Sequence, residues 1–180
     1  MATPERRLLL DDRAYARTLH RMALDILQQT PDVGRLVLVG IQRRGVELAA
    51  RLARFLADES GSDVPRGALD ITLYRDDLNA PHGGIQPFVR TTEIGFDIDS
   101  KTIILVDDVL YTGRSTRAAM DALMDLGRPK AIRLAVLVDR AGRELPIQAD
   151  YAGYEAQVGP GQSVQVNFVE SDGKDEVTVA

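Results

Sequence analysis

The chain has 180 residues, 44% of them hydrophobic, which is enough for one globular domain with a sizeable core. It contains no cysteine, which excludes disulfides, thiol nucleophiles and thiolate metal sites and favours a reducing, cytoplasmic location. The net charge of −5 argues against nonspecific nucleic-acid binding over the whole surface, although it permits a local basic patch. No apolar stretch approaches transmembrane length, so we expect no membrane segment.

Helical and strand patterns alternate along the chain, which predicts an α/β domain with a mostly parallel twisted sheet flanked by helices. The expected elements, in chain order, are a helix from Asp12 to the residues before Pro31, a strand at 35–41, a helix at 46–59, a strand at 68–74, a strand at 102–106 with a helix after it, and a strand at 131–140. No repeat or linker interrupts this order, so residues 1–180 are expected to form a single domain.

Two further segments have patterns of their own. Residues 75–100 are polar and irregular, and we expect them to form a lid or binding loop in which 88–96 is one arm of a hairpin. The tail alternates hydrophobic and polar residues on both sides of Asp172 and Gly173, which predicts a closing hairpin at about 163–180.

The run TIILVDDVLYTGRST, residues 102–116, is the most informative part of the chain. It places two carboxylates, Asp107 and Asp108, at the end of an apolar strand, and a loop of small and hydroxylated residues before a helix. Donors at a helix start suit a phosphate, and adjacent carboxylates can accept hydrogen bonds from vicinal hydroxyls. The run therefore indicates a site for a ribose 5-phosphate, with ordinary turn formation and helix capping as the alternative. Neither a P-loop nor a dinucleotide-binding fingerprint occurs.

Polar residues also follow the other expected strands, at 40–45, 74–77 and 139–140. In open α/β sheets the ligand crevice lies beyond the carboxyl ends of the strands, so these segments are expected to meet there. Arginines and glycines at such ends suit a diphosphate, through bidentate hydrogen bonds and exposed backbone N–H groups. For Arg43 and Arg44 the alternative is a solvated turn.

The run VDDVLYTGRST closely resembles the phosphoribosyl diphosphate (PRPP) motif of type I phosphoribosyltransferases. Over about residues 8–153, the chain further resembles the bifunctional pyrimidine operon attenuator/uracil phosphoribosyltransferase (PyrR) family, through LVGIQRRG, LDITLYRDDL and LAVLVDRAGRELPIQADY in the same order. The resemblance implies a type I phosphoribosyltransferase fold with a small hood. It also implies the reaction of uracil with PRPP to give UMP and diphosphate, and an assembly of dimers or larger homo-oligomers.

The same resemblance implies a role for each group of site residues. Asp107 and Asp108 become the catalytic pair that holds the ribose hydroxyls. The implied ligand-binding residues are Val109, Leu110, Tyr111, Thr112, Gly113, Arg114, Ser115 and Thr116 for the 5-phosphate, Ile41, Gln42, Arg43, Arg44 and Gly45 for the diphosphate, Tyr74, Arg75, Asp76 and Asp77 for the lid, and Val138, Asp139 and Arg140 for uracil. Magnesium is expected to arrive with PRPP, so no all-protein metal cage is expected.

The second activity that the resemblance implies is UMP-dependent binding of pyrimidine-operon leader mRNA. Here the chain departs from the family pattern GHRELPIRADYxGKN-x-PTS: Gln148 replaces an arginine, Tyr154 replaces a lysine, and the PTS element is missing. Fewer positive charges mean weaker RNA binding with a flatter salt dependence. The remaining candidates for RNA binding are Arg13, Arg17, His20, Arg21 and Arg143. Their alternative role is the solvated face of an amphipathic helix.

Three alternatives therefore stay open. Beside the bifunctional reading, the chain could be a phosphoribosyltransferase that has lost RNA binding, a regulator with vestigial catalysis, or a metal-dependent phosphohydrolase that uses Asp107 and Asp108 as ligands. The last reading is the weakest, because Asp139 is the only further acid that is well placed at a strand end.

Overall fold

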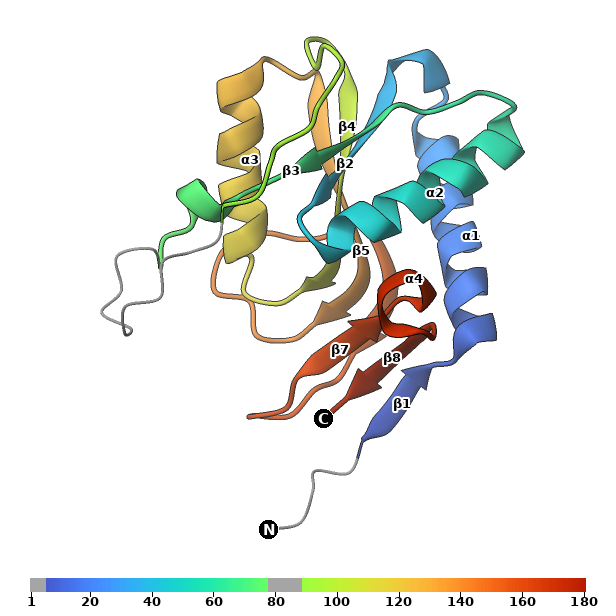
Figure 1. The fold of residues 1–180 in the computed structure, drawn as a ribbon, viewed down its shortest axis with the longest axis vertical. Coiled ribbons are helices and arrows are strands. Elements are labelled where there is room, and N and C mark those ends of the chain that lie inside the picture. The colour runs from blue at the N-terminus through green and yellow to red at the C-terminus, as the bar shows by residue number, and fades with distance from the viewer. Residues whose placement is uncertain (1–5, 78–88) are drawn as a thin grey trace.

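A central sheet is built from five parallel strands, β2 (Leu36–Ile41), β3 (Arg66–Leu69), β4 (Thr102–Leu110), β5 (Ala131–Arg140) and β6 (Tyr151–Ala156). Their order is β3-β2-β4-β5-β6, so β4 lies in the middle. Helices α1 (Asp12–Gln29) and α2 (Arg44–Ser60) cover one face, and α3 (Arg114–Leu126) covers the other (Figure 1). This computed structural model describes residues 6–77 and 89–180.

The strands are buried on both faces, as is usual for a parallel sheet between helices. All six residues of β2 are buried. Leu36 and Leu38 belong to the core packed by α1 and α2, whereas Val37 and Val39 belong to the core packed by α3. Successive side chains of a strand point to opposite faces, so one apolar run serves both cores.

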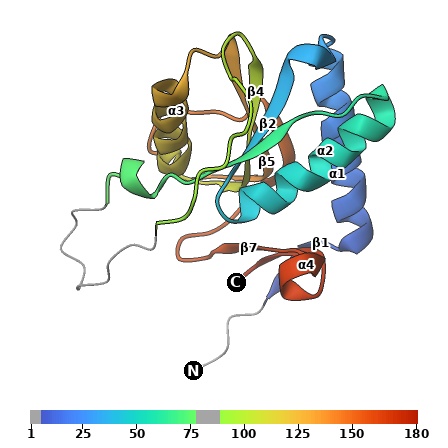
Figure 2. The same ribbon diagram turned by 45° about the horizontal axis from the view of Figure 1, so that its top comes forward.

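A second, antiparallel sheet lies beyond the carboxyl ends of the central strands (Figures 1 and 2). It has the order β1-β8-β7 and consists of β1 (Arg7–Leu10), β7 (Val164–Asn167) and β8 (Glu176–Val179). The short helix α4 (Val169–Asp172) connects β7 to β8, and Gly173 follows it with a φ of +79°. We call β1, β7, β8 and α4 the hood. The antiparallel pairing of β7 with β8 confirms the hairpin indicated by the tail.

Most expected elements are confirmed, with β5 at its expected bounds. The expected strand at 68–74 is wrong from residue 70 onward, because β3 covers Arg66–Leu69 and a 3-10 turn covers Thr72–Tyr74. The side chain of Asp70 explains the turn: its Oδ1 accepts hydrogen bonds from the backbone N and the hydroxyl of Thr72, at 3.0 and 2.6 Å. Such local bonds compete with strand pairing.

Two other expectations need correction. Of the expected hairpin arm at 88–96, residue 88 lies outside the described residues, and the rest forms a single antiparallel bridge, between Glu93 and Ala68, instead of a strand. The acid pair does not follow its strand but lies inside it, because β4 continues to Leu110 and pairs there with Asp139 of β5.

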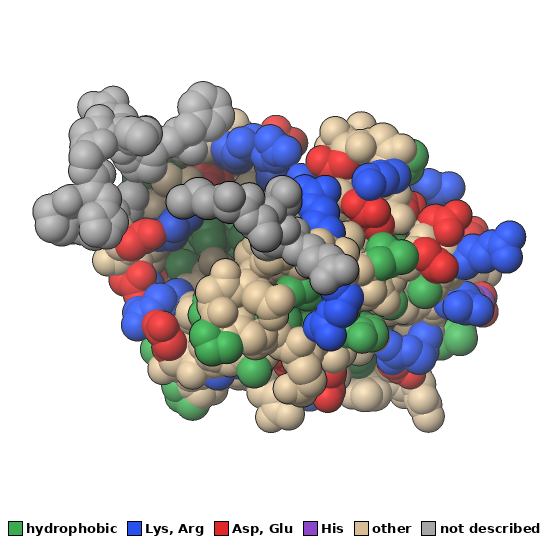
Figure 3. Space-filling model, turned by 90° about the horizontal axis from the view of Figure 1, so that it is seen from below, with side chains coloured by type: hydrophobic (Ala, Val, Ile, Leu, Met, Phe, Trp, Pro, Cys, Tyr) green, Lys and Arg blue, Asp and Glu red, His purple; other side chains and the backbone are tan. Residues whose placement is uncertain are grey.

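Charged side chains of both signs are interspersed on the face seen from below (Figure 3). None of the helices in the described ranges combines the length and the apolar character that crossing a membrane requires.

Candidate active site

The acid pair lies at the centre of the sheet edge that faces the hood. Asp107 and Asp108 are both half-buried in the last part of β4. Their carboxylates accept hydrogen bonds from the next backbone N–H groups: Asp108 N donates to Asp107 Oδ1, and Val109 N donates to Asp108 Oδ1, both at 2.9 Å. Each carboxylate therefore has a fixed orientation and keeps oxygen lone pairs for a ligand.

The two carboxylates have different surroundings. Asp107 lines a cavity with the loop that precedes α3. Asp108 continues the row of Ile104 and Val106, which face α1 and α2. Burial, and next the negative charge of Asp108, raise the pKa of Asp107 well above its ordinary value. Repulsion between the two neighbouring carboxylates thus acts in the same direction as burial.

This raised pKa predicts how stability depends on pH. The contribution of Asp107 is fully present below its unfolded pKa of about 4 and is lost as pH rises through the higher folded pKa. We therefore expect the stability of Asp107→Asn relative to the unaltered protein to increase from pH 4 to pH 8. Urea unfolding of both proteins across this range measures the difference. A difference that stays constant with pH would show that the carboxyl is not perturbed.

The loop after β4 forms a small cavity. Its wall includes Asp107, Tyr111, Thr112 and Gly113, with Ser115 and Thr116 from the first turn of α3, and its volume is about 150 Å³. Gly113 has a φ of +91°, in the left-handed region where glycine is favoured. The first N–H groups of α3 have no partner within the helix and carry the positive end of its dipole. The cavity therefore offers donors and a favourable potential to a phosphate.

The guanidinium of Arg114 is paired with two carboxylates and is not free to bind a ligand in this cavity. Its Nε donates to Glu144 Oε2 at 2.7 Å, and its Nη1 donates to Asp76 Oδ2 at 2.5 Å. These bonds raise the pKa of the Arg114 guanidinium. The side chain thus connects the start of the expected lid to the segment after β5. The backbone N of Arg114, at the helix start, donates to Thr112 Oγ1 at 3.3 Å.

The turn after β2 packs directly against β4. A Cβ on Gly45 would lie 2.3 Å from the carbonyl oxygen of Val106, and a Cβ on Gly40 would lie 2.4 Å from the carbonyl oxygen of Gly45. Only glycine permits this approach, which brings residues 41–45 against the strand that carries the acid pair. The Gln42–Arg43 peptide bond is cis, and Arg43 is exposed. Arg44 and Gly45 belong to the first turn of α2, which is longer than the sequence indicates.

The side chain of Arg44 binds the hood. Its Nη2 donates to Asp172 Oδ1 at 3.2 Å, and its Nη1 donates to Asp172 Oδ2. The guanidinium also lies 5.7 Å from the ring centre of Phe168. In the segment expected to bind diphosphate, the Arg44 side chain is therefore paired with Asp172. The sequence pattern does not reveal this pair.

The carboxyl end of β5 lies beside the end of β4. Val138 is buried, Asp139 is half-buried, and Arg140 is 8% exposed. The Arg140 guanidinium stacks 3.9 Å from the ring centre of Tyr111, and its Nη1 donates to the carbonyl oxygen of Gln162 at 2.9 Å. The strand end expected to bind uracil is therefore in contact with the loop expected to bind phosphate.

Arg143 lies in this site and not on the α1 surface with the other RNA candidates. Its Nη2 donates to Asp139 Oδ1 at 2.6 Å, its Nε donates to the Ile147 carbonyl at 2.7 Å, and its Nη1 donates to the Tyr111 carbonyl. Arg143 therefore does not share one surface patch with the four candidates on α1. Its guanidinium links the loop before α3 to the carboxyl end of β5, because residues 141–147 fold back across both.

The described part of the expected lid packs on α3. The hydroxyl of Tyr74 donates to Asp125 Oδ2 at 2.7 Å, and the carbonyl of Tyr74 accepts from Arg117 at 2.9 Å. Arg75 pairs with Asp77 at 2.6 Å. Residues 78–88, which make up much of the expected lid, lie outside the described residues.

The other RNA candidates lie together on α1. Arg13 and Arg17 are exposed, with no ion pair in the ranges that the structure describes. His20 pairs with Glu59 at 2.7 Å, and Arg21 donates to the carbonyl of Gly153 at 2.7 Å. Gly153 precedes Tyr154 on β6, so the basic helix and one of the two altered positions are neighbours. Gln148 is exposed.

The sequence gives no signal for several residues that shape the site. Asp172 contacts a residue 128 positions earlier, and Glu144 contacts one 30 positions earlier. Gly142 has a φ of +117°, and a Cβ there would lie 2.3 Å from the ring of Tyr111. Neither the Arg44–Asp172 pair nor the Arg114–Glu144 pair follows a local spacing rule. Among residues 6–77 and 89–180, no three His, Asp or Glu side chains are grouped so that they could hold a metal ion.

Residues 8–169 match the family described as "Phosphoribosyl transferase domain". The "Bifunctional protein PyrR" of Pelotomaculum thermopropionicum is 52% identical over 176 residues, which cover 97% of this chain and 96% of the relative. The protein of the same name from Thermus aquaticus is 54% identical over 169 residues, covering 94% and 92%.

Solved structures with the same fold include the hypoxanthine phosphoribosyltransferase of Trypanosoma cruzi, with a TM-score of 0.72 and 19% identity over 96% of this chain and 95% of that one. The HGPRT-ase of Leishmania tarentolae has a TM-score of 0.69 and 20% identity over 99% and 98%. At these identities the likeness shows the fold alone: an α/β sheet with helices on both faces and the hood beyond its strand ends.

Proposed function

Because the chain belongs to the phosphoribosyltransferase family, and within it to the bifunctional PyrR proteins, we propose that it transfers the phosphoribosyl group of PRPP to uracil, giving UMP and diphosphate. One observation carries the proposal: three segments converge on the end of β4. Gly45 of the turn after β2 packs on Val106, and Asp107 lines the cavity of the loop before α3. The end of β5 pairs with Leu110.

We assign the reacting centre to the acid pair. Displacement at C1 of the ribose builds positive oxocarbenium character, as in glycosyl transfer generally. Asp107 and Asp108 bind the ribose hydroxyls and stabilise that charge, which a fixed carboxylate does well in a site of low dielectric. Residues 109–116 bind the 5-phosphate at the start of α3. This loop lies next to Asp107, as a ribose and its own phosphate require.

The diphosphate is assigned to residues 41–45 and uracil to residues 138–140. Binding to residues 41–45 involves backbone N–H groups and Arg43, because the Arg44 side chain is paired with Asp172. Val138 and Asp139 present backbone groups to the base, and Arg140 closes the site against Tyr111. Residues 74–77, with the segment after them, form the lid that excludes water.

We propose that Mg²⁺ arrives bound to PRPP. Carboxylate oxygens suit this ion, and Asp107 and Asp108 keep lone pairs free beside residues 41–45. There, the ion would supply positive charge to the departing diphosphate. A cytoplasmic location and a homo-oligomer of two or more subunits remain predictions from the sequence.

The test of the proposal is PRPP consumption with uracil and with hypoxanthine, the base named for the solved structure of the same fold. We expect uracil to support turnover with UMP as the product, and hypoxanthine to give none. Turnover with hypoxanthine and none with uracil would reject the base assignment while keeping the reaction class.

We also propose a second function, UMP-responsive binding of the pyrimidine-operon leader mRNA. The observation that favours it is the spacing of Arg13, Arg17 and Arg21 at four-residue intervals, which places them on one face of α1. Two of these arginines are exposed and have no ion pair in the described residues, so their charge is available to phosphates.

The paired substitution Arg13→Gln/Arg17→Gln should weaken RNA binding and flatten its salt dependence. Each lost phosphate contact lowers the slope of log affinity against log salt by about 0.7–0.9. Gel shifts with the leader RNA, with and without UMP and at several salt concentrations, measure this slope. Arg66→Gln is the matched control, because Arg66 is exposed on β3 at the edge of the sheet. Equal slopes for both variants, or no UMP-dependent binding even at low salt, would reject the RNA surface.

A further inference from the structure

One carboxylate of the hood binds the arginine at the start of α2. Asp172 of α4 accepts hydrogen bonds from both terminal nitrogens of Arg44, and its Oδ2 also accepts from the backbone N of Phe168 at 2.9 Å. The hydroxyl of Ser171 donates to Glu47 Oε2 at 3.3 Å in the next part of α2. Because the backbone of Phe168 fixes the carboxylate, the position of Arg44 depends on the hood. The two side chains are 27% and 24% exposed, so water does not fully screen the pair.

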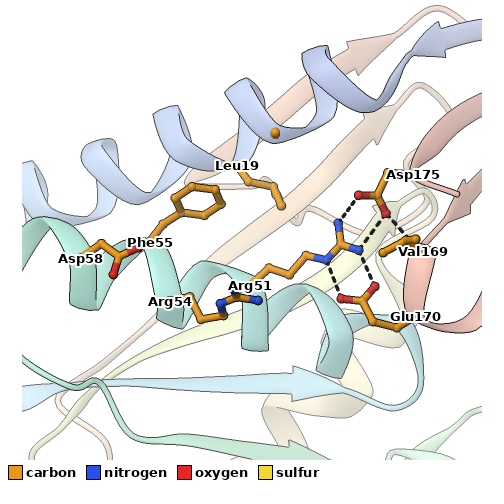
Figure 4. A pocket seen from close by; sticks show the side chains of 9 residues that line it. Leu19, Arg51, Arg54, Phe55, Asp58, Val169, Glu170 and Asp175 are labelled. Atoms are coloured by element: carbon orange, nitrogen blue, oxygen red, sulfur yellow. Dashed lines mark hydrogen bonds and ion pairs between the residues drawn. The ribbon is translucent and has the colours of Figure 1, made fainter.

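A second arginine of α2 holds the hood independently of the first. Arg51, two turns later, donates to both Glu170 and Asp175, with Nη2 2.7 Å from Asp175 Oδ1 (Figure 4). Its side chain is 12% exposed, and its guanidinium lies 5.2 Å from the ring centre of Phe168. The hood therefore stays docked on α2 when the Arg44 contact is removed, and the two contacts can be tested separately.

Arg44 is also adjacent to the reacting centre. It lies between Arg43 and Gly45, and Gly45 touches the backbone of β4 at Val106. The hydrogen bonds that Arg44 donates to Asp172 are the main cause that raises the pKa of Arg44, and the charge of Asp108 contributes in the same direction. A shift of Arg44 would therefore move the turn that faces the acid pair.

We propose that Asp172 is a positioning residue that holds Arg44, and through it residues 41–45, in the conformation that binds the diphosphate of PRPP. The inference rests on the proposed function, because it uses the assignment of these residues to the diphosphate. By this means the C-terminal hairpin, far from the site in sequence, sets the affinity for one substrate and leaves the affinity for the base unchanged.

The test compares Asp172→Asn, Asp172→Glu and Glu170→Gln with the unaltered protein. Calorimetry with PRPP and Mg²⁺ gives Kd, and steady-state rates give kcat and both KM values. Loss of one charge-assisted contact corresponds to about a tenfold change in affinity. We expect Asp172→Asn to raise Kd and KM for PRPP about tenfold, with kcat and the KM for uracil within about twofold, and Asp172→Glu to recover part of the loss. Glu170→Gln, which removes one partner of Arg51 and leaves Asp175, should change none of these values.

Three results would overturn the inference. Unchanged PRPP affinity in Asp172→Asn would show that the pair does not position the turn. Tighter PRPP binding would show that Asp172 restrains Arg44 from the ligand. An equal loss in Glu170→Gln would show a general effect of hood stability. Failure of the unaltered protein to bind PRPP is a different outcome, because it rejects the proposed function and the inference together.

Discussion

Asp108→Asn should lower kcat for UMP formation by about 100- to 1,000-fold, the usual cost of removing one group that stabilises transition-state charge. The substitution keeps the shape of the side chain and an Oδ1 that accepts the hydrogen bond of Val109 N. It removes only the negative charge that faces the developing positive charge at C1. The measurement is the steady-state rate at saturating uracil and PRPP.

The control for this prediction is Asp25→Asn, which removes one carboxylate charge from an exposed ion pair with Arg21 on α1. We expect its kcat to be unchanged within about twofold, since surface pairs contribute little. Thermal unfolding should give similar Tm values for both variants. A normal kcat in Asp108→Asn would remove the acid pair from the mechanism, and a low Tm would assign the loss to folding.

Gly45→Ala should destabilise the fold by about 1–3 kcal/mol, as overpacked sites do. Helix propensity alone predicts the opposite sign, because alanine is preferred to glycine by about 1 kcal/mol inside a helix. The added Cβ would lie 2.3 Å from the carbonyl oxygen of Val106 and 3.2 Å from the Cα of Asp107. Both are backbone atoms of the central strand, so relief requires α2 and the turn before it to move away from β4.

Thermal unfolding of Gly45→Ala should show a fall in Tm of roughly 2–12 °C for a chain of this size. PRPP turnover should fall with it, because the turn and the acid pair separate. Gly34→Ala is the matched control: its Cβ would meet only the Asp32 side chain, at an ordinary 3.5 Å. Equal or higher stability in Gly45→Ala would mean that the close approach of α2 to β4 is not required.

The fold was predictable where one local pattern decides the structure. The apolar run of β5 is long and continuous, and its bounds agree with the expectation. The strand expected at 68–74 failed because Asp70 bonds to Thr72, which a hydrophobic pattern does not reveal. β6 was not predicted, because its sequence YAGYEA shows little alternation of apolar and polar residues. It forms a strand by pairing with β5, which is a tertiary contact.

The motifs that make up the site were predictable from the sequence, but the contacts between their side chains were not. A glycine-rich turn and an acid pair are visible in the sequence, whereas the partner of an arginine is set by tertiary structure. Arg44 donates to Asp172, and Arg143 donates to Asp139 and to the Tyr111 carbonyl. Both results depend on segments that meet only after the sheet and the hood have formed.

The measurement that tests the account most directly is diphosphate release from PRPP with and without uracil. The converging segments at the end of β4 predict that release requires uracil and that one UMP forms for each diphosphate. A phosphohydrolase that used the acid pair as metal ligands would release phosphate or diphosphate at the same rate without uracil. That result, with no UMP formed, would contradict the assignment of this site to phosphoribosyl transfer.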